Sequence, residues 1–82
     1  MFIQMARPEQ RQQPNWAIIK AIGQKIKSVR QNKKISIYKL AERSELSYVT
    51  ISRIENGHKN LTITTLYEFA KGLKVHPSKL LV

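Results

Sequence analysis

The chain has 82 residues and carries 15 lysines and arginines against five aspartates and glutamates, a formal charge of +10, and it contains no cysteine. A chain this short forms one domain with a compact core, and the lack of cysteine excludes disulfide scaffolds, thiolate zinc sites and redox motifs. The charge favours a polyanionic partner, either nucleic acid or an anionic membrane surface, although a basic surface without such a partner would have the same composition.

Membrane segments and metal sites are not expected either. The longest apolar run, residues 16–19 (WAII), is far shorter than the roughly 20 residues that a spanning helix needs. Phe2 and Ile3 are not followed by an apolar block, so no secretory signal is predicted. His58 and His76 are too far apart to form a local metal pair. We therefore expect a cytoplasmic protein without a metal or other cofactor.

Residues 1–14 are predicted to form a flexible N-terminal arm ahead of a domain over residues 15–82. The segment is polar and rich in glutamine, and proline interrupts regular structure at positions 8 and 14. Arg7 and Arg11 either extend along a polyanion or belong to a disordered extension.

An amphipathic helix is predicted over residues 16–33. Asn15 can cap its start, and apolar residues recur at helical spacing at Ile19, Ile22, Ile26 and Val29. Basic residues occupy the other faces, so the exterior of this helix is positively charged.

Two short helices follow over residues 37–44 and 48–56. Ser36 and Ser47 are their caps, and Gly57 ends the second because glycine readily adopts the left-handed backbone. A joint of about three residues favours the steep crossing of a helix-turn-helix. The apolar residues that could share one core are Leu40, Ala41, Leu46, Ile51 and Ile54. Such residues would also suit any small helical bundle.

Two more helices complete the domain. Thr62 caps a helix whose apolar stripe consists of Ile63, Leu66, Phe69, Ala70 and Leu73. Pro77 begins a last helix over residues 77–81, since proline is tolerated at a first helical position. With no strand-like alternation, an all-α domain of five helices is expected.

Three features are spaced in a recognisable way: Leu40-Ala41, the run ISRIENG at residues 51–57, and Leu66 with Ala70 and Leu73. Through them, residues 22–81 resemble the phage repressor and Cro (Xre-type) superfamily of helix-turn-helix DNA-binding domains. It implies a compact five-helix domain like that of lambda repressor and a sequence-specific DNA-binding transcriptional regulator such as a repressor, bound to double-stranded DNA as a homodimer on a palindromic operator.

A shorter resemblance concerns residues 60–63 (NLTI), which are similar to restriction-modification controller proteins. These controllers are small members of the same superfamily. Short repressors and the antitoxins of toxin–antitoxin pairs share much of the pattern, so the biological role stays open.

The resemblance implies that the second motif helix enters the major groove. Tyr48, Val49, Thr50 and Arg53 would then contact bases, and arginine can bond two acceptors of guanine. The alternative for Tyr48 is packing against a neighbouring side chain. The alternative for Arg53 is a salt bridge with an acidic residue, Glu42 or Glu45.

Phosphate contacts are expected around this helix, where they position the protein without reading sequence. Helix starts attract anions through their free N–H groups. The expected residues are Ser36, Lys39, Arg43, Ser47, Asn56, His58, Lys59 and Asn60. As surface residues, Lys39 and Arg43 need no function.

Four positions need separate comment. Glu55 would repel DNA, so the resemblance implies a structural role, and we expect it to pair with a basic residue such as Arg30. Three positions depart from the family pattern. Ile37 stands where the family frequently has glutamine, Glu45 where it usually has glycine at a positive φ, and Leu61 where it frequently has proline.

The C-terminus is expected to form the dimer interface through Pro77, Leu80, Leu81 and Val82. Two recognition helices would then lie roughly 34 Å apart, one turn of duplex. The alternative is that these residues close the core of the monomer.

Other function classes are weaker. An antitoxin-like module that mainly holds a protein partner, such as a toxin, would use an exposed patch of Phe2, Ile3 and Trp16. A membrane-surface peptide is disfavoured, because its basic residues would lie on one amphipathic helix face, whereas those of this chain fall on several helices. An enzyme is not expected, because no Ser-His-Asp or Cys-His set, paired carboxylates or phosphate-binding glycine loop is present.

Overall fold

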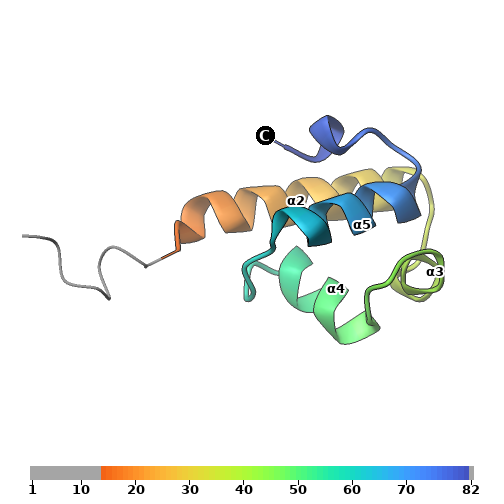
Figure 1. The fold of residues 1–82 in the computed structure, drawn as a ribbon, viewed down its shortest axis with the longest axis horizontal. Helices are drawn as coiled ribbons and strands as arrows, with labels where there is room; N and C mark the ends of the chain where they lie inside the picture. The colour runs from red at the N-terminus through yellow and green to blue at the C-terminus, as the bar shows by residue number, and fades with distance from the viewer. Residues whose placement is uncertain (1–13, 82) are drawn as a thin grey trace, which may run out of the picture.

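The computed structural model describes residues 14–81. Within them lie four α-helices and one 3-10 turn. Their bounds are α2 Trp16–Asn32, α3 Ile37–Arg43, α4 Tyr48–Glu55, α5 Ile63–Leu73 and η1 Pro77–Leu80 (Figure 1). No strand occurs among these residues, so the all-α class is confirmed. Of the arm expected over residues 1–14, positions 1–13 lie outside the described residues.

The expected fifth helix is instead a single 3-10 turn, so the count of five helices was wrong. Its hydrogen bonds run from Lys79 N–H to the His76 carbonyl and from Leu81 N–H to the Ser78 carbonyl, at 2.9 and 3.3 Å. These bonds span three residues. A segment of only four residues suits this tighter bonding, since 3-10 helices occur in short pieces.

The helix starts follow the predicted capping residues. The side chains of Asn15, Ser36, Ser47 and Thr62 each accept a hydrogen bond from the backbone N–H three residues later, at 3.0 to 3.1 Å. Each bond satisfies a donor that the helix itself leaves free, typically contributing about 1 kcal/mol. Local sequence signals therefore set all four starts.

The core lies between the four helices, with α2 packed on α4 and α5 and with α3 packed on α4 and α5. Its fully buried side chains are Ile26, Leu40, Ile51, Ile54, Phe69, Leu73 and Leu80. The expectation that Leu80 lies on a dimer surface was wrong. The η1 turn folds back against α2 and α5, and Leu80 is 0% exposed there.

Two glycines permit close helix contacts. A Cβ at Gly23 would collide with the backbone carbonyl oxygen of Ile54, which lies on α4. A Cβ at Gly72 would collide with a methyl group of Leu40 on α3. Helix α2 thus approaches the backbone of α4 directly, and this contact fixes how α4 is presented.

The joint between α3 and α4 uses extended rather than left-handed backbone. Ser44 has φ −135° and ψ 178°, and Glu45 is not among the described residues with positive φ. The Ser44 hydroxyl donates to the Leu40 carbonyl at 2.8 Å and accepts from Leu46 N–H at 3.2 Å. Glu45 N–H donates to the Glu68 carboxylate at 2.8 Å. Side chains therefore satisfy a turn that in the resembled family usually contains glycine.

Candidate functional site

Helix α4 has one buried side and one outward side. Ile51 and Ile54 are fully buried, whereas Val49 is 62% exposed and Arg53 is also exposed. Thr50 is half-buried, and its hydroxyl accepts a hydrogen bond from the Ser47 hydroxyl at 3.0 Å. The helix therefore offers the outward side chains expected to contact bases at its N-terminal half and one turn further along.

Tyr48 packs against Tyr38 of α3. The ring centroids are 4.7 Å apart with an interplanar angle of 36°, in the range of favourable aromatic pairs. Tyr38 is 74% exposed and Tyr48 is 41% exposed, so the pair lies on the surface. Tyr48 therefore packs against a neighbouring side chain, which was the alternative expected for it, and part of its ring stays accessible. Sequence analysis missed Tyr38, whose only signal was an exposed aromatic residue in the first turn of α3.

Arg53 has no ion pair among the described residues. The described pairs are Arg30–Glu55, Lys39–Glu42 and Lys71–Glu68. Glu42, one expected partner of Arg53, instead contacts Lys39 at 2.8 Å, and this contact lowers the pKa of Glu42. The guanidinium group of Arg53 is thus available to a ligand.

Glu55 is buried and ion-paired with Arg30, as expected. The Arg30 Nε and Nη2 donate to the two carboxylate oxygens at 2.7 and 3.0 Å, and Nη1 donates to the Ile35 carbonyl at 2.8 Å. The pair joins α2 to the end of α4 and to the loop before α3. An acidic residue in the motif is thereby neutralised inside the domain and is not presented outward.

The expected phosphate contacts lie in two groups. Ser36, Lys39 and Ser47 belong to the first turns of α3 and α4 or cap them, with both serine hydroxyls accepting backbone N–H groups. The second group is the exposed segment between α4 and α5, formed by Asn56, His58, Lys59 and Asn60. Gly57 within it has φ +76°, the left-handed value expected at the end of the helix.

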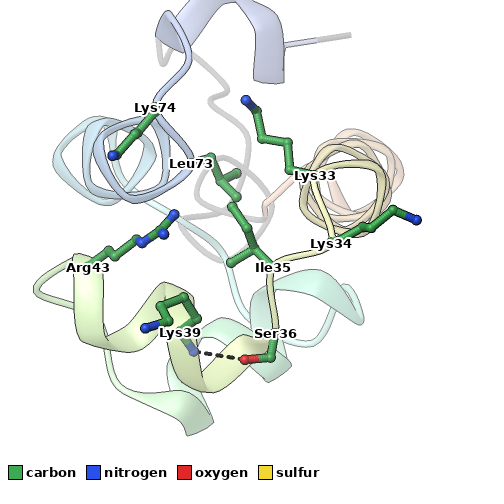
Figure 2. A pocket seen from close by; sticks show the side chains of 8 residues that line it. All are labelled: Lys33, Lys34, Ile35, Ser36, Lys39, Arg43, Leu73 and Lys74. Carbon is green, nitrogen blue, oxygen red and sulfur yellow. Dashed lines mark hydrogen bonds between the residues drawn. The ribbon is translucent and has the colours of Figure 1, made fainter.

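Arg43, also expected at a phosphate, lies in a basic hollow. This hollow has a volume of about 540 Å³. We call it the basic hollow; its lining residues are Lys33, Lys34, Ile35, Ser36, Lys39, Arg43, Leu73 and Lys74 (Figure 2). Figure 2 shows Arg43 and Lys74 extending toward the space between α3 and the end of α5.

Sequence analysis missed Lys33, Lys34 and Lys74. Both Lys34 and Lys74 have φ +59°, the left-handed region that glycine adopts freely. For other residues this conformation costs roughly 1–2 kcal/mol. The adjacent lysines after helix α2 are visible in the sequence, but the sequence does not indicate that residues of α3 and of the end of α5 lie beside them.

The C-terminal residues divide between core and surface. Leu80 is buried, Pro77 is half-buried and Leu81 is 50% exposed, while Val82 lies outside the described residues. Leu81 borders a mainly apolar hollow of about 320 Å³. The other lining residues are Ile22, Leu61, Thr62, Ile63 and Leu66. Ile63 is 71% exposed, so an unpartnered apolar surface extends beyond the predicted C-terminal set.

The patch expected for a protein partner is described only in part. Trp16 is partly exposed and borders a hollow with Lys20 and His58, whereas Phe2 and Ile3 lie outside the described residues. None of the helices within residues 14–81 has the length and apolar character of a membrane span. The same residues contain no group of three or more side chains able to hold a metal ion.

The chain matches a protein-family model and several solved structures. The helix-turn-helix family model HTH_3 matches residues 26–80. The restriction-modification controller protein C.AhdI from Aeromonas hydrophila has a TM-score of 0.76 and 26% identity, covering 79% of this chain and 98% of its own. A comparison with curated proteins gives no match.

Two further solved structures are similar. The restriction-modification controller C.Esp1396I, solved as a tetramer with its natural 35 base-pair operator, has a TM-score of 0.73 and 33% identity, covering 77% of this chain and 83% of that chain. An HTH_3 family transcriptional regulator from Vibrio cholerae has a TM-score of 0.78 and 25% identity, covering 82% of this chain but 38% of that one.

Proposed function

This chain belongs to the helix-turn-helix family HTH_3, as the sequence predicted, and from that premise we propose that it is a dimeric transcriptional regulator that reads a palindromic DNA operator. The observation that carries the proposal is the outward side of α4. Val49 and Arg53 are exposed on a helix whose opposite side is fixed in the core by Ile51 and Ile54. A rigidly held helix with free polar and apolar groups suits entry into the major groove.

Each outward side chain of α4 has a defined role in this proposal. Arg53 donates two hydrogen bonds to guanine, a contact that discriminates against other bases by about 1–3 kcal/mol. Val49 and the methyl group of Thr50 pack against a thymine methyl. Tyr48 offers its accessible ring edge and hydroxyl from the position set by Tyr38.

Phosphate contacts on both sides of the groove would hold α4 in register. The first turns of α3 and α4 contribute Ser36, Lys39 and Ser47, and the segment after α4 contributes Asn56, His58, Lys59 and Asn60. Together with a charge of +10, these groups supply the salt-dependent attraction common to DNA-binding proteins.

The dimer interface in this proposal lies on the apolar surface around Ile63 and Leu81 and includes the half-buried Pro77. Both Ile63 and Leu81 are at least half exposed and border the same hollow. Isologous pairing of this surface would cover it in both copies. The C.Esp1396I controller, which is bound to its operator as a tetramer, supports an oligomeric mode of binding.

The test is selection of bound sequences from a random duplex pool at near-physiological salt. A retained palindrome with half-sites about one helical turn apart, roughly 34 Å, is expected. A single unrepeated motif would refute the dimer. No enrichment, with binding that collapses as salt rises, would refute sequence reading and favour a protein partner at the surface near Trp16.

A further inference from the structure

The basic hollow gathers cations from three separate elements. Lys33 and Lys34 follow α2, Lys39 and Arg43 belong to α3, and Lys74 ends α5. Figure 1 places the C-terminal end of α2, helix α3 and the C-terminal end of α5 at one end of the molecule. The fold therefore concentrates positive charge at an end of the domain that α4 does not occupy.

The charge in this hollow is largely unneutralised. None of its lining residues is acidic. Among residues 14–81, Lys39 is the one lining cation with an ion pair, to Glu42 on the outer side of α3. A concave surface lined by one sign of charge concentrates counterions, so the hollow suits an anion with several charges.

Two of the lysines occupy backbone positions for which glycine is better suited. Lys34 and Lys74 each have φ +59°, and Lys74 N–H completes the end of α5 by bonding to the Ala70 and Lys71 carbonyls. Glycine would provide the same turns without strain. Backbone strain thus falls at two positions that line the hollow. In Figure 2 the Lys34 side chain extends away from Arg43 and Lys74, so Lys74 is the strained lysine whose charge lies beside Arg43.

The hollow also adjoins the surface assigned to DNA. Ser36 and Lys39 line it and lie at the start of α3, where the proposed function places a phosphate. A duplex carries one negative charge per about 1.7 Å of its axis, so backbone leaving the half-site presents further phosphates beside this turn.

We infer that the basic hollow binds the phosphate backbone of DNA that flanks the half-site and so extends the footprint past the bases read by α4. The inference rests on the proposed function. Ser36 and Lys39 hold the edge of the half-site, and Arg43 and Lys74 contact the flank. This contact adds affinity without adding sequence preference.

The experiment compares two duplexes that contain the selected site. The short one ends at the outer edges of the half-sites, and the long one extends about ten base pairs further on each side. The test variant is Lys34→Gly/Lys74→Gly, because glycine removes the charges and suits the left-handed backbone. Arg43→Ala is a second test variant, and Lys25→Ala, which removes an exposed charge of α2 away from the hollow, is the control.

For the unmodified protein, the slope of log affinity against log salt should be steeper on the long duplex by about 0.9 for each flank contact. The glycine variant should lose about one contact per half-site from this difference, or about two for the bound dimer, while it keeps its affinity for the short duplex and unfolds at no lower temperature. Lys25→Ala should keep the difference. An unchanged difference in the glycine variant, or equal losses on both duplexes, would overturn the inference.

The proposed function has its own readout in the same assay. If the inference alone fails, Arg53→Ala still weakens the short selected duplex more than a scrambled one. If Arg53→Ala weakens both alike, base reading fails as well.

Discussion

Arg30 on α2 and Glu55 at the end of α4 form a two-pronged ion pair inside the domain, at 2.7 and 3.0 Å. Both side chains are buried, and Arg30 also donates to the Ile35 carbonyl, so one guanidinium connects α2, α4 and the loop before α3. Lost hydration offsets much of the attraction within a buried ion pair. Removing one partner is nevertheless strongly destabilising, because the other charge is left buried and uncompensated. The pair thus makes the position of α4 sensitive to either charge.

Replacing Glu55 should therefore destabilise the fold sharply. Glu55→Ala leaves the buried Arg30 charge uncompensated and is expected to cost about 3–5 kcal/mol in the free energy of unfolding. Glu55→Gln should cost less, since it keeps the shape and one acceptor. Urea denaturation measures both. An unfolding midpoint unchanged by Glu55→Gln would show that the charge is dispensable. The double variant Arg30→Met/Glu55→Met should lose less free energy of unfolding than the two single variants lose in sum.

The contact between α2 and α4 gives a second prediction. Gly23→Ala should destabilise by about 1–3 kcal/mol, because its Cβ meets the rigid carbonyl of Ile54. Gly72→Ala is the matched control on α5, where the obstacle is the Leu40 side chain, which can adjust more easily. Thermal unfolding of the two variants should thus rank Gly23→Ala as the more harmful. The reverse order would mean that α2 and α4 separate readily.

Local signals predicted much of this fold. The caps at Asn15, Ser36, Ser47 and Thr62 are chemical features of short segments, so they could be found without tertiary information. The Arg30–Glu55 pair was predictable because an acidic residue within a basic motif requires compensation. The burial of Leu80 was not predictable, because it depends on how η1 folds back against α2 and α5.

The remaining site residues depend on contacts between elements. The Tyr38–Tyr48 pair requires the crossing of α3 and α4, which hydrophobic periodicity does not define. Lys34 and Lys74 adopt a backbone conformation that their residue type disfavours, so propensity argued against the turns they make. Their meeting at one hollow follows from the packing of α5 on α3.

Base reading and phosphate attraction can be separated with two variants of α4 and the segment after it. Arg53→Ala should weaken the selected duplex by about 1–3 kcal/mol for each half-site and a scrambled duplex far less. Lys59→Ala should weaken both alike and reduce the salt slope by about one for each bound protomer, or about two for the dimer. Binding titrations at several salt concentrations measure both effects. Equal losses on the two duplexes for Arg53→Ala would remove it from base reading.

Tyr38 is predicted to influence specificity through Tyr48. Tyr38→Ala should change base preference where Tyr48 reads the duplex, because the ring that positions Tyr48 is lost. Aromatic pairs contribute about 0.5–1.5 kcal/mol, so stability should fall only modestly. Repeating the selection experiment with Tyr38→Ala and with Tyr67→Ala, an exposed tyrosine on α5, provides the measurement and its control. If both variants select the unmodified operator, Tyr38 has no such role.

The Glu68 carboxylate gives the joint between α3 and α4 a pH dependence. The hydrogen bond from Glu45 N–H, and then the contact with Lys71, lower the pKa of Glu68 below its ordinary value. Because the pKa is lower in the folded state, the stabilisation is complete above the unfolded pKa, about 4.3, and is lost as pH falls through the folded pKa. Acid should therefore loosen the joint that orients α4.

Glu68→Gln tests this dependence. Glutamine still accepts the Glu45 N–H but makes a neutral bond, which is weaker than one to a carboxylate. The thermal midpoint of the variant should lie below that of the unmodified protein at pH 7, and the gap should close as pH falls from about 4.3 through the lowered pKa of Glu68. Glu42→Gln is the comparison, since Lys39 also lowers the pKa of Glu42 but this surface pair does not touch the joint, so it gives the pH-dependent gap that a carboxylate away from the joint produces. A constant gap between Glu68→Gln and the unmodified protein from pH 7 to pH 3 would show that shape at this position, and not charge, supports the turn.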